Sequence, residues 1–103
     1  TDQMNPIGLL VRMLGQLLKE MEVVQSQGAG YYTCVPFAKR FNRLLEQARA
    51  IAGDAAGMMN TFEPLQEIDP KDPGDKSKRL LEIHIEVGQL IALLQALQEE
   101  GQR

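Results

Sequence analysis

The chain contains one histidine and one cysteine, the two side chains most often used in nucleophilic and metal chemistry. His84 and Cys34 stand in different parts of the sequence, and neither has a second histidine or cysteine with which to share a metal. A zinc site of the usual type needs three or four such ligands. The paired Glu-x-x-His motifs of di-iron bundles are also missing. We therefore expect no metal site, no cofactor and no catalytic residue.

The surroundings of His84 in a helix would be apolar. Its neighbours three and four positions away are Leu80, Leu81, Val87 and Gly88. This pattern is typical of a histidine at the edge of a core. The alternative is a phosphoacceptor, because histidine-phosphotransfer domains expose a histidine on a bundle helix, usually followed by Lys at +3 and Gly at +4. Gly88 matches that pattern, whereas Val87 stands where the lysine would be.

The segment from Gly28 to Pro36 holds both tyrosines and the cysteine. Tyr31 and Tyr32 are either partner contacts, because tyrosine is enriched at interfaces, or a cap over one end of the fold. Cys34 lies near a helix start, where the pKa of a thiol can fall. The plainer expectation for Cys34 is a half-buried thiol packed under the loop.

Lys39, Arg40, Arg43 and Arg49 form a basic stripe on the second predicted helix, just after this segment. Such a stripe usually forms a solvated face with local ion pairs, and the alternative is a docking site for an acidic partner. Glu46 lies within the stripe and the net charge of the chain is −3. Because a phosphate backbone attracts cationic proteins, we expect no nucleic-acid binding.

The spacing of apolar residues predicts an all-α fold. Leu, Ile, Val and Met recur every three or four residues over long stretches, and no strand-like alternation occurs. The predicted helices cover residues 5–26, 34–61 and 73–100. We expect a single domain, residues 1–103, built as an antiparallel up-down-up bundle of three long helices.

Two of the helix starts share one signal. Asn5-Pro6 and Asp72-Pro73 each place a capping side chain before a proline, which loses no hydrogen bond at the first helical position. The end of the second helix is less defined, because Gly53 lowers helix propensity. We expect the second helix to continue to residue 61, with a break near Gly53 as the alternative.

Charges at the helix ends oppose the helix dipoles. The basic groups at the second and third starts are Lys39, Arg40, Arg43, Lys76, Lys78 and Arg79, and the acidic groups at the first and third ends are Glu20, Glu22, Glu99 and Glu100. An up-down-up bundle would place the second start beside both acidic ends. It would also place the third start near Asp2, Asp54 and Glu63.

The bulk composition is that of an ordinary globular chain, with 103 residues, 44% hydrophobic and 24% charged. We expect no stretch to approach the roughly 20 apolar residues of a membrane span. A lone cysteine fits a reducing compartment, so we expect a cytoplasmic protein.

The apolar residues outnumber those needed for one stripe per helix. The surplus residues are Leu9, Met13, Val23, Leu45, Met59, Leu81, Ile85 and Leu93. Large exposed apolar patches mark partner surfaces. We therefore expect a non-enzymatic interaction or oligomerisation module that binds a protein partner or itself, most simply as a homodimer. The alternative is a histidine-phosphotransfer-like signalling domain centred on His84.

Overall fold

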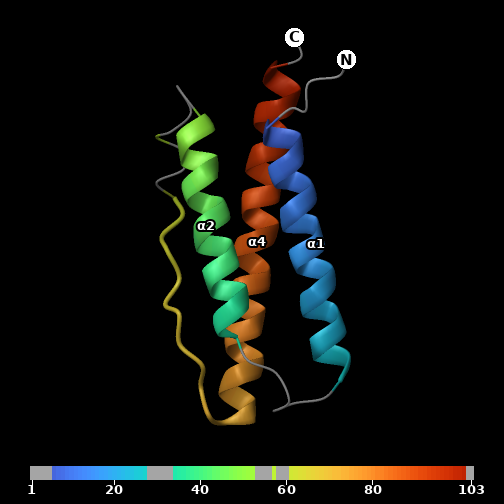
Figure 1. Cartoon of the computed structure of the whole chain (residues 1–103), viewed down its shortest axis with the longest axis vertical. Helices are drawn as coiled ribbons and strands as arrows, with labels where there is room; N and C mark the ends of the chain where they lie inside the picture. Colours follow the sequence, from blue (N-terminus) through green and yellow to red (C-terminus); the bar gives the residue numbers. More distant parts are fainter. Residues whose placement is uncertain (1–5, 28–33, 53–56, 58–60, 102–103) are drawn as a thin grey trace.

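The computed structural model describes residues 6–27, 34–52, 57 and 61–101. In these ranges the chain forms three long helices, α1 (Pro6–Ser26), α2 (Val35–Ile51) and α4 (Pro73–Gly101), and no strand (Figure 1). The helices pack against one another along their lengths. The predicted all-α bundle of three helices is confirmed.

The predicted helix starts follow the expected chemistry. Pro6 and Pro73 are the first residues of α1 and α4. The Asp72 carboxylate accepts a hydrogen bond from the Gly74 N–H at 2.8 Å, which satisfies one of the free donors at the start of α4. Asn5, the other predicted cap, lies outside the described residues.

The second helix ends earlier than we expected. α2 stops at Ile51, with Ala52 as its C-cap, and Thr61 lies in a turn rather than a helix. The expectation of a helix through residue 61 was therefore wrong at its end. Gly53, the alternative break point, lies outside the described residues. The sequence that follows contains Gly53 and Gly57, and glycine loses more backbone entropy in a helix than any other residue.

The up-down-up order is also wrong. α1 runs in one direction, and α2 and α4 both run in the other, so α2 and α4 are parallel (Figure 1). Contacts between the helix ends agree with these directions. The Cys34 thiol at the start of α2 donates to the Lys76 carbonyl near the start of α4. Met21, near the end of α1, lines a pocket with Leu80 near the start of α4.

The parallel pair is possible because residues 61–72, here called the strap, run back along α2. The strap hydrogen-bonds to α2 in reverse order: Phe62 to Arg49, and Leu65 to Asn42. An extended segment of this length spans up to about 40 Å. The 17-residue α2 is only about 26 Å long. The strap therefore returns the chain to the starting end of α2 before α4 begins.

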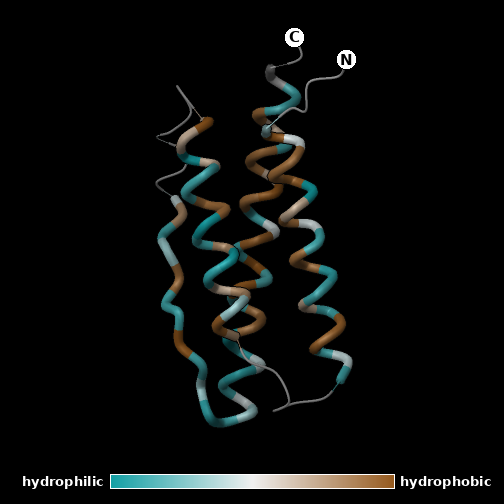
Figure 2. The backbone as a smooth tube through the Cα atoms, viewed as in Figure 1, coloured by the Kyte–Doolittle hydropathy of each residue, from teal (hydrophilic) through white to brown (hydrophobic). Residues whose placement is uncertain are grey.

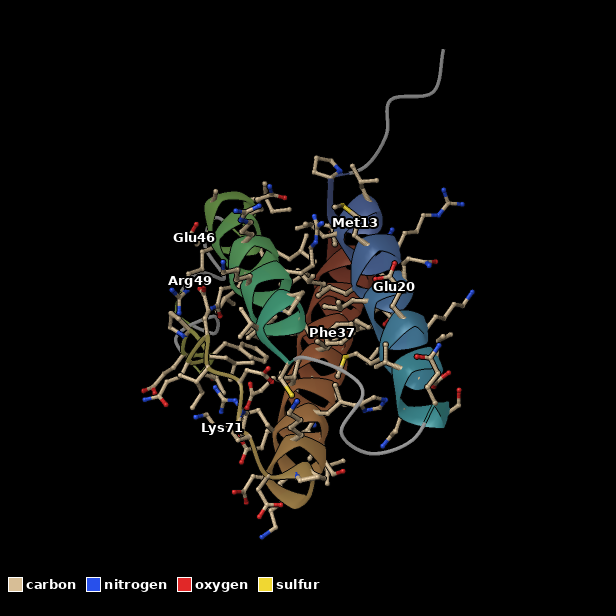
Figure 3. All side chains as sticks on the ribbon, turned by 60° about the horizontal axis from the view of Figure 1, so that its bottom comes forward. Met13, Glu20, Phe37, Glu46, Arg49 and Lys71 are labelled. Carbon is tan, nitrogen blue, oxygen red and sulfur yellow. The ribbon has the colours of Figure 1, made fainter. Side chains whose placement is uncertain are left out.

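The core lies between the three helices and the strap. The most deeply buried large side chains from α1, α2 and α4 are Leu14, Met21, Phe41, Leu44, Leu45, Leu80, Ile83, Val87, Leu90 and Leu94. Burying each such side chain contributes about 1.5–3 kcal/mol. Phe37 points inward from the start of α2 (Figure 3), and Phe62 anchors the strap to this core.

Figure 2 shows hydrophobic residues recurring along much of α4. By length and composition, its segment Pro73–Glu99 is the one described helix that could cross a membrane. This corrects the expectation that no segment would be apolar enough, and the reason is that residues 87–98 carry no charge. The buried core helix of a soluble bundle meets the same criterion. Only 28% of the most apolar 18-residue stretch of this helix, here called its apolar window, is buried inside the bundle. Part of the apolar surface of α4 is therefore left uncovered.

Candidate interaction surfaces

The strap is held to α2 by one asparagine. The Asn42 Oδ1 accepts from the Leu65 N–H, and the Asn42 Nδ2 donates to the Leu65 carbonyl, both at 2.8 Å. The same Nδ2 also donates to Glu67 Oε2 at 3.2 Å. The side-chain amide thus pairs with the strap backbone as a neighbouring strand would. It satisfies the Leu65 N–H and carbonyl, which would otherwise be half-buried without a hydrogen-bond partner.

Two arginines add to this attachment. Arg49 of α2 donates to the Phe62 carbonyl, and Arg79 of α4 donates to the Gln66 carbonyl. Arg79 also forms an ion pair with Glu82 at 2.9 Å. In Figure 3, Arg49 lies on the side of α2 that carries the strap. The Nε atoms of both arginines are buried and have no hydrogen-bond partner among the residues that the structure describes. The guanidinium groups are therefore used to fix backbone carbonyls, and their remaining donors bear a desolvation cost.

Cys34 lies where α2, α4 and the strap meet. Its backbone N–H donates to Asp69 Oδ1 at 3.1 Å, and its thiol donates to the Lys76 carbonyl at 3.6 Å. Asp69 also lies 3.9 Å from the Lys76 ammonium group. The Cys34 side chain has no exposed surface. We call this place the junction, because one small buried residue joins the start of α2, the start of α4 and the strap.

The environment of Cys34 opposes thiolate formation. Burial is the largest cause that raises the pKa of the Cys34 thiol above its ordinary value of 9.0, and the charge of Asp69 adds to it. Lys76 and Arg79 lower the pKa by less. Our suggestion that the helix start would lower this pKa was therefore wrong. The thiol is fully buried rather than half-buried, and its arrangement is that of a packing residue.

His84 is half-buried beside α1. It lines a small pocket with Met21, Gln25, Leu80 and Leu81, and none of these side chains is cationic. A phosphorylated histidine carries extra negative charge, which a nearby lysine or arginine would stabilise. This pocket offers only apolar groups and one amide. The position at the core edge is the one expected from the sequence, and no lysine or arginine lines this pocket in the described part of the chain.

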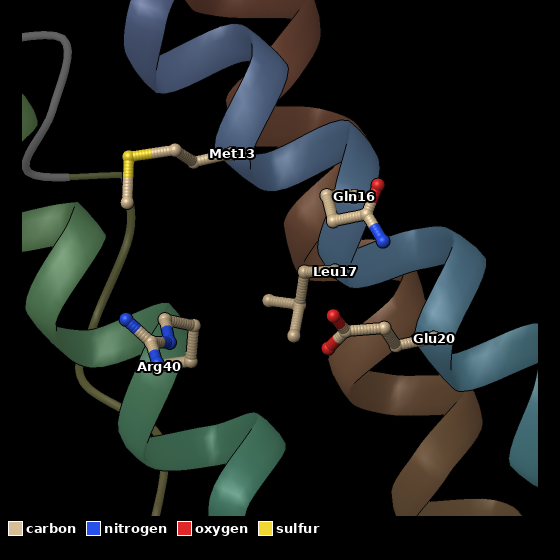
Figure 4. A pocket seen from close by; sticks show the side chains of 5 residues that line it. All are labelled: Met13, Gln16, Leu17, Glu20 and Arg40. Carbon is tan, nitrogen blue, oxygen red and sulfur yellow. The ribbon is translucent and has the colours of Figure 1, made fainter.

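The basic stripe of α2 does not form one patch. Arg40 turns toward α1 and lines a pocket with Met13, Leu17 and Glu20 (Figure 4).

Lys39 and Arg43 instead line a second pocket, with Asn42, Glu46 and Glu67. Each group of cations thus faces acidic residues of the same chain. Tyr31 and Tyr32, the other predicted partner contacts, lie outside the described residues.

The predicted pairing of charges between helices holds for one end only. The basic start of α2 lies beside the acidic end of α1, where Arg40 and Glu20 share a pocket. The end of α4 lies at the far end of the bundle, because α2 and α4 are parallel. At the start of α4, Lys76 pairs with Asp69 and Arg79 donates to the Gln66 carbonyl, so both contact strap residues other than the predicted Glu63. Asp2 and Asp54 lie outside the described residues.

Most of the predicted surplus of apolar side chains is found at the surface. Leu9, Val23, Leu81 and Ile85 are exposed, Met13 and Leu93 are half-buried, and Leu45 is buried. Met59 lies outside the described residues. Leu81 and Ile85 stand one turn apart on α4 with 55% and 51% of their surface exposed. They form the part of the uncovered apolar surface that belongs to α4, and other exposed apolar side chains lie on α1, α2 and the strap, namely Leu9, Val23, Ile51 and Ile68.

We did not predict Asn42 and Asp69, the residues that hold the strap. Asparagine is a weak helix former, so its place in the middle of α2 was a signal that the side chain has another task. No group of three or more His, Cys, Asp or Glu that could hold a metal occurs among the residues that the structure describes. No protein-family model, curated protein or solved structure matches this chain.

Proposed function

We propose that this chain is a non-enzymatic helical module that associates with another protein surface through the outer side of α4. The observation that carries the proposal is the exposure of Leu81 and Ile85, more than half of each side chain, on a helix whose apolar window is only 28% buried. Leaving two aliphatic side chains in water costs the burial free energy that a partner would recover. Contiguous exposed apolar side chains of this kind are a feature of protein interfaces.

A binding role agrees better with the reactive side chains than a catalytic role. The pKa of the Cys34 thiol is raised by burial, so little thiolate forms at neutral pH. His84 lies among Met21, Leu80 and Leu81, without a charged neighbour in its pocket. Neither side chain has the surroundings that would activate it as a nucleophile.

The proposed partner is a protein. The net charge of −3 disfavours nucleic acid. Glu82 and Glu86 within α4 disfavour insertion of this helix into a bilayer, because each buried carboxylate would be costly there. The proposal includes homo-oligomerisation in the cytoplasm, for which a second copy of the outer side of α4 is the simplest partner.

Site-specific photo-crosslinking in the natural host tests the proposal. A photoreactive amino acid in place of exposed Leu81 is expected to give covalent protein adducts. The same probe in place of exposed Glu46, on α2, serves as the control. An Ile85→Ser change in the Leu81-probe chain should reduce the adducts without changing the circular dichroism spectrum. Adducts at position 81 no more abundant than at position 46 would overturn the proposal.

A further inference from the structure

The outer side of α4 carries a seven-residue repeat that lies apart from the buried α4 residues Leu80, Ile83, Val87, Leu90 and Leu94. Successive members of the repeat are alternately three and four residues apart, so they form one continuous line along the helix. We call this line the outer stripe. Its members are Lys78, Leu81, Ile85, Gly88, Ala92, Gln95 and Glu99. All are exposed except Gly88, which is half-buried.

The two halves of the outer stripe are complementary in size and charge. The half nearer the start of α4 carries a lysine and two bulky aliphatic side chains, Leu81 and Ile85. The half nearer the end carries small or polar residues and closes with Glu99. Exposed Ala96 borders this half. A stripe with large residues at one end and small ones at the other fits a copy of itself that runs in the opposite direction.

We infer that the outer stripe pairs with a second copy of this chain, α4 against α4 in antiparallel orientation, with the two-fold axis at the Gly88–Gln89 peptide. This partner assignment rests on the proposed function. The two residues of each contact pair lie equally far from that axis along their helices. Ile85 of one copy faces Ala92 of the other, and Leu81 faces Ala96. Lys78 faces Glu99, so each end of the interface gains one ion pair.

At the middle of the interface, Gly88 of each copy faces the exposed Gln89 of the other. A Cβ atom added to Gly88 would meet no heavy atom within 4 Å, so the space outside this glycine is open. Because glycine has no side chain, it leaves this space for the Gln89 side chain of the opposite helix. The bulky residues lie on either side of this point and fit over the alanines of the opposite copy.

The ion pair between Lys78 and Glu99 cannot form within one chain. Both residues lie in the single helix α4, 21 positions apart, which corresponds to about 32 Å. Salt bridges need an N···O separation near 4 Å. Any energetic coupling between these two side chains must therefore arise between two copies.

Charge reversal tests the inference. Sedimentation equilibrium from about 1 µM to about 1 mM should show a monomer–dimer equilibrium for the unaltered chain. Lys78→Glu or Glu99→Lys alone places like charges at both ends of the interface, and we expect each to weaken dimerisation about tenfold. The double variant, Lys78→Glu with Glu99→Lys, exchanges the charges and should restore dimerisation. Lys39→Glu, on α2, changes net charge by the same amount as Lys78→Glu and should leave it unchanged.

The outcomes separate this inference from the proposed function. A monomer at every concentration, or a dimer that the double variant fails to restore, would overturn the antiparallel pairing. Photo-crosslinks from position 81 to a different protein would also overturn it, while the proposed function would stand. Flotation of the chain with neutral or anionic phospholipid vesicles, blocked by Ile85→Ser, would overturn the assignment to a second copy. Since all the changed residues are exposed, circular dichroism should show the same fold in each variant.

Discussion

The side-chain amide of Asn42 and the backbone of Leu65 form a reciprocal pair of hydrogen bonds, both 2.8 Å long. This pair fastens the middle of the strap to the middle of α2. The strap in turn decides the topology, because it brings the chain back to the beginning of α2 before α4 starts. One side-chain amide therefore contributes to the direction of a helix more than thirty positions away in the sequence.

Asn42→Ala should release the middle of the strap. The change leaves the N–H and carbonyl of Leu65 without their partners in a part-buried place, and we expect a loss of about 1–3 kcal/mol in the free energy of unfolding. Urea denaturation measures this loss. Amide hydrogen exchange at Leu65 should accelerate at the same time.

Two variants serve as controls for the Asn42 prediction. Asn42→Asp keeps the acceptor for the Leu65 N–H, and it places a carboxylate near Glu67, so an intermediate loss is expected. Gln47→Ala changes an exposed side chain on the same helix and should stay within about 0.5 kcal/mol of the unaltered chain. Equal stability of Asn42→Ala and Gln47→Ala would show that the pair does not hold the strap.

The Cys34 thiol should make stability depend on pH at the alkaline end. Burial and Asp69 raise the pKa of this thiol in the folded state, so the native chain holds the thiol proton more tightly than the unfolded chain. The stabilising contribution is complete below the unfolded pKa and is lost as pH rises through the folded pKa. Stability should therefore fall above about pH 9 more steeply in the unaltered chain than in Cys34→Ala. Parallel pH profiles for the two chains would contradict this account.

Alkylation of Cys34 should report whether the strap is docked. The thiol has no exposed surface, and the Asp69 side chain of the strap accepts a hydrogen bond from the Cys34 N–H. Iodoacetamide should react slowly with the native chain and readily with the urea-unfolded chain. Asp69→Ala should accelerate native-state alkylation, whereas Glu63→Ala, an exposed change elsewhere in the strap, should not. Rapid alkylation of the unaltered native chain would show that the junction is open in solution.

The sequence predicted the core more accurately than the path of the chain. The three-and-four spacing of apolar residues predicted helices with one buried side, and Leu14, Leu44 and Leu90, which follow this spacing, are buried. The direction of α4 depended instead on whether residues 61–72 were compact or extended. That choice is set by polar contacts such as Asp69 to Cys34, which join distant positions without a local pattern.

The residues of the candidate surface were likewise predicted where the local sequence pattern decides their position, and not where a distant segment does. Leu81 and Ile85 were predicted as surplus apolar residues, and they are exposed on α4 as expected. The basic residues were predicted as one stripe from their spacing on α2. They are divided because Arg40 faces α1, whereas Lys39 and Arg43 face strap residue Glu67. Spacing along one helix cannot reveal which neighbour covers which side.

Distances between spin labels test the parallel arrangement of α2 and α4. Labels at positions 39 and 78 lie near the starts of these two helices, whereas position 99 lies near the end of α4. In a Cys34→Ala background, the 39–78 distance should be clearly shorter than the 39–99 distance, because the 29-residue α4 is about 43 Å long. An up-down-up bundle would reverse this order. Dilution of the labelled chain with excess unlabelled chain removes distances between two copies, so a longer 39–78 distance under those conditions would refute the parallel pair.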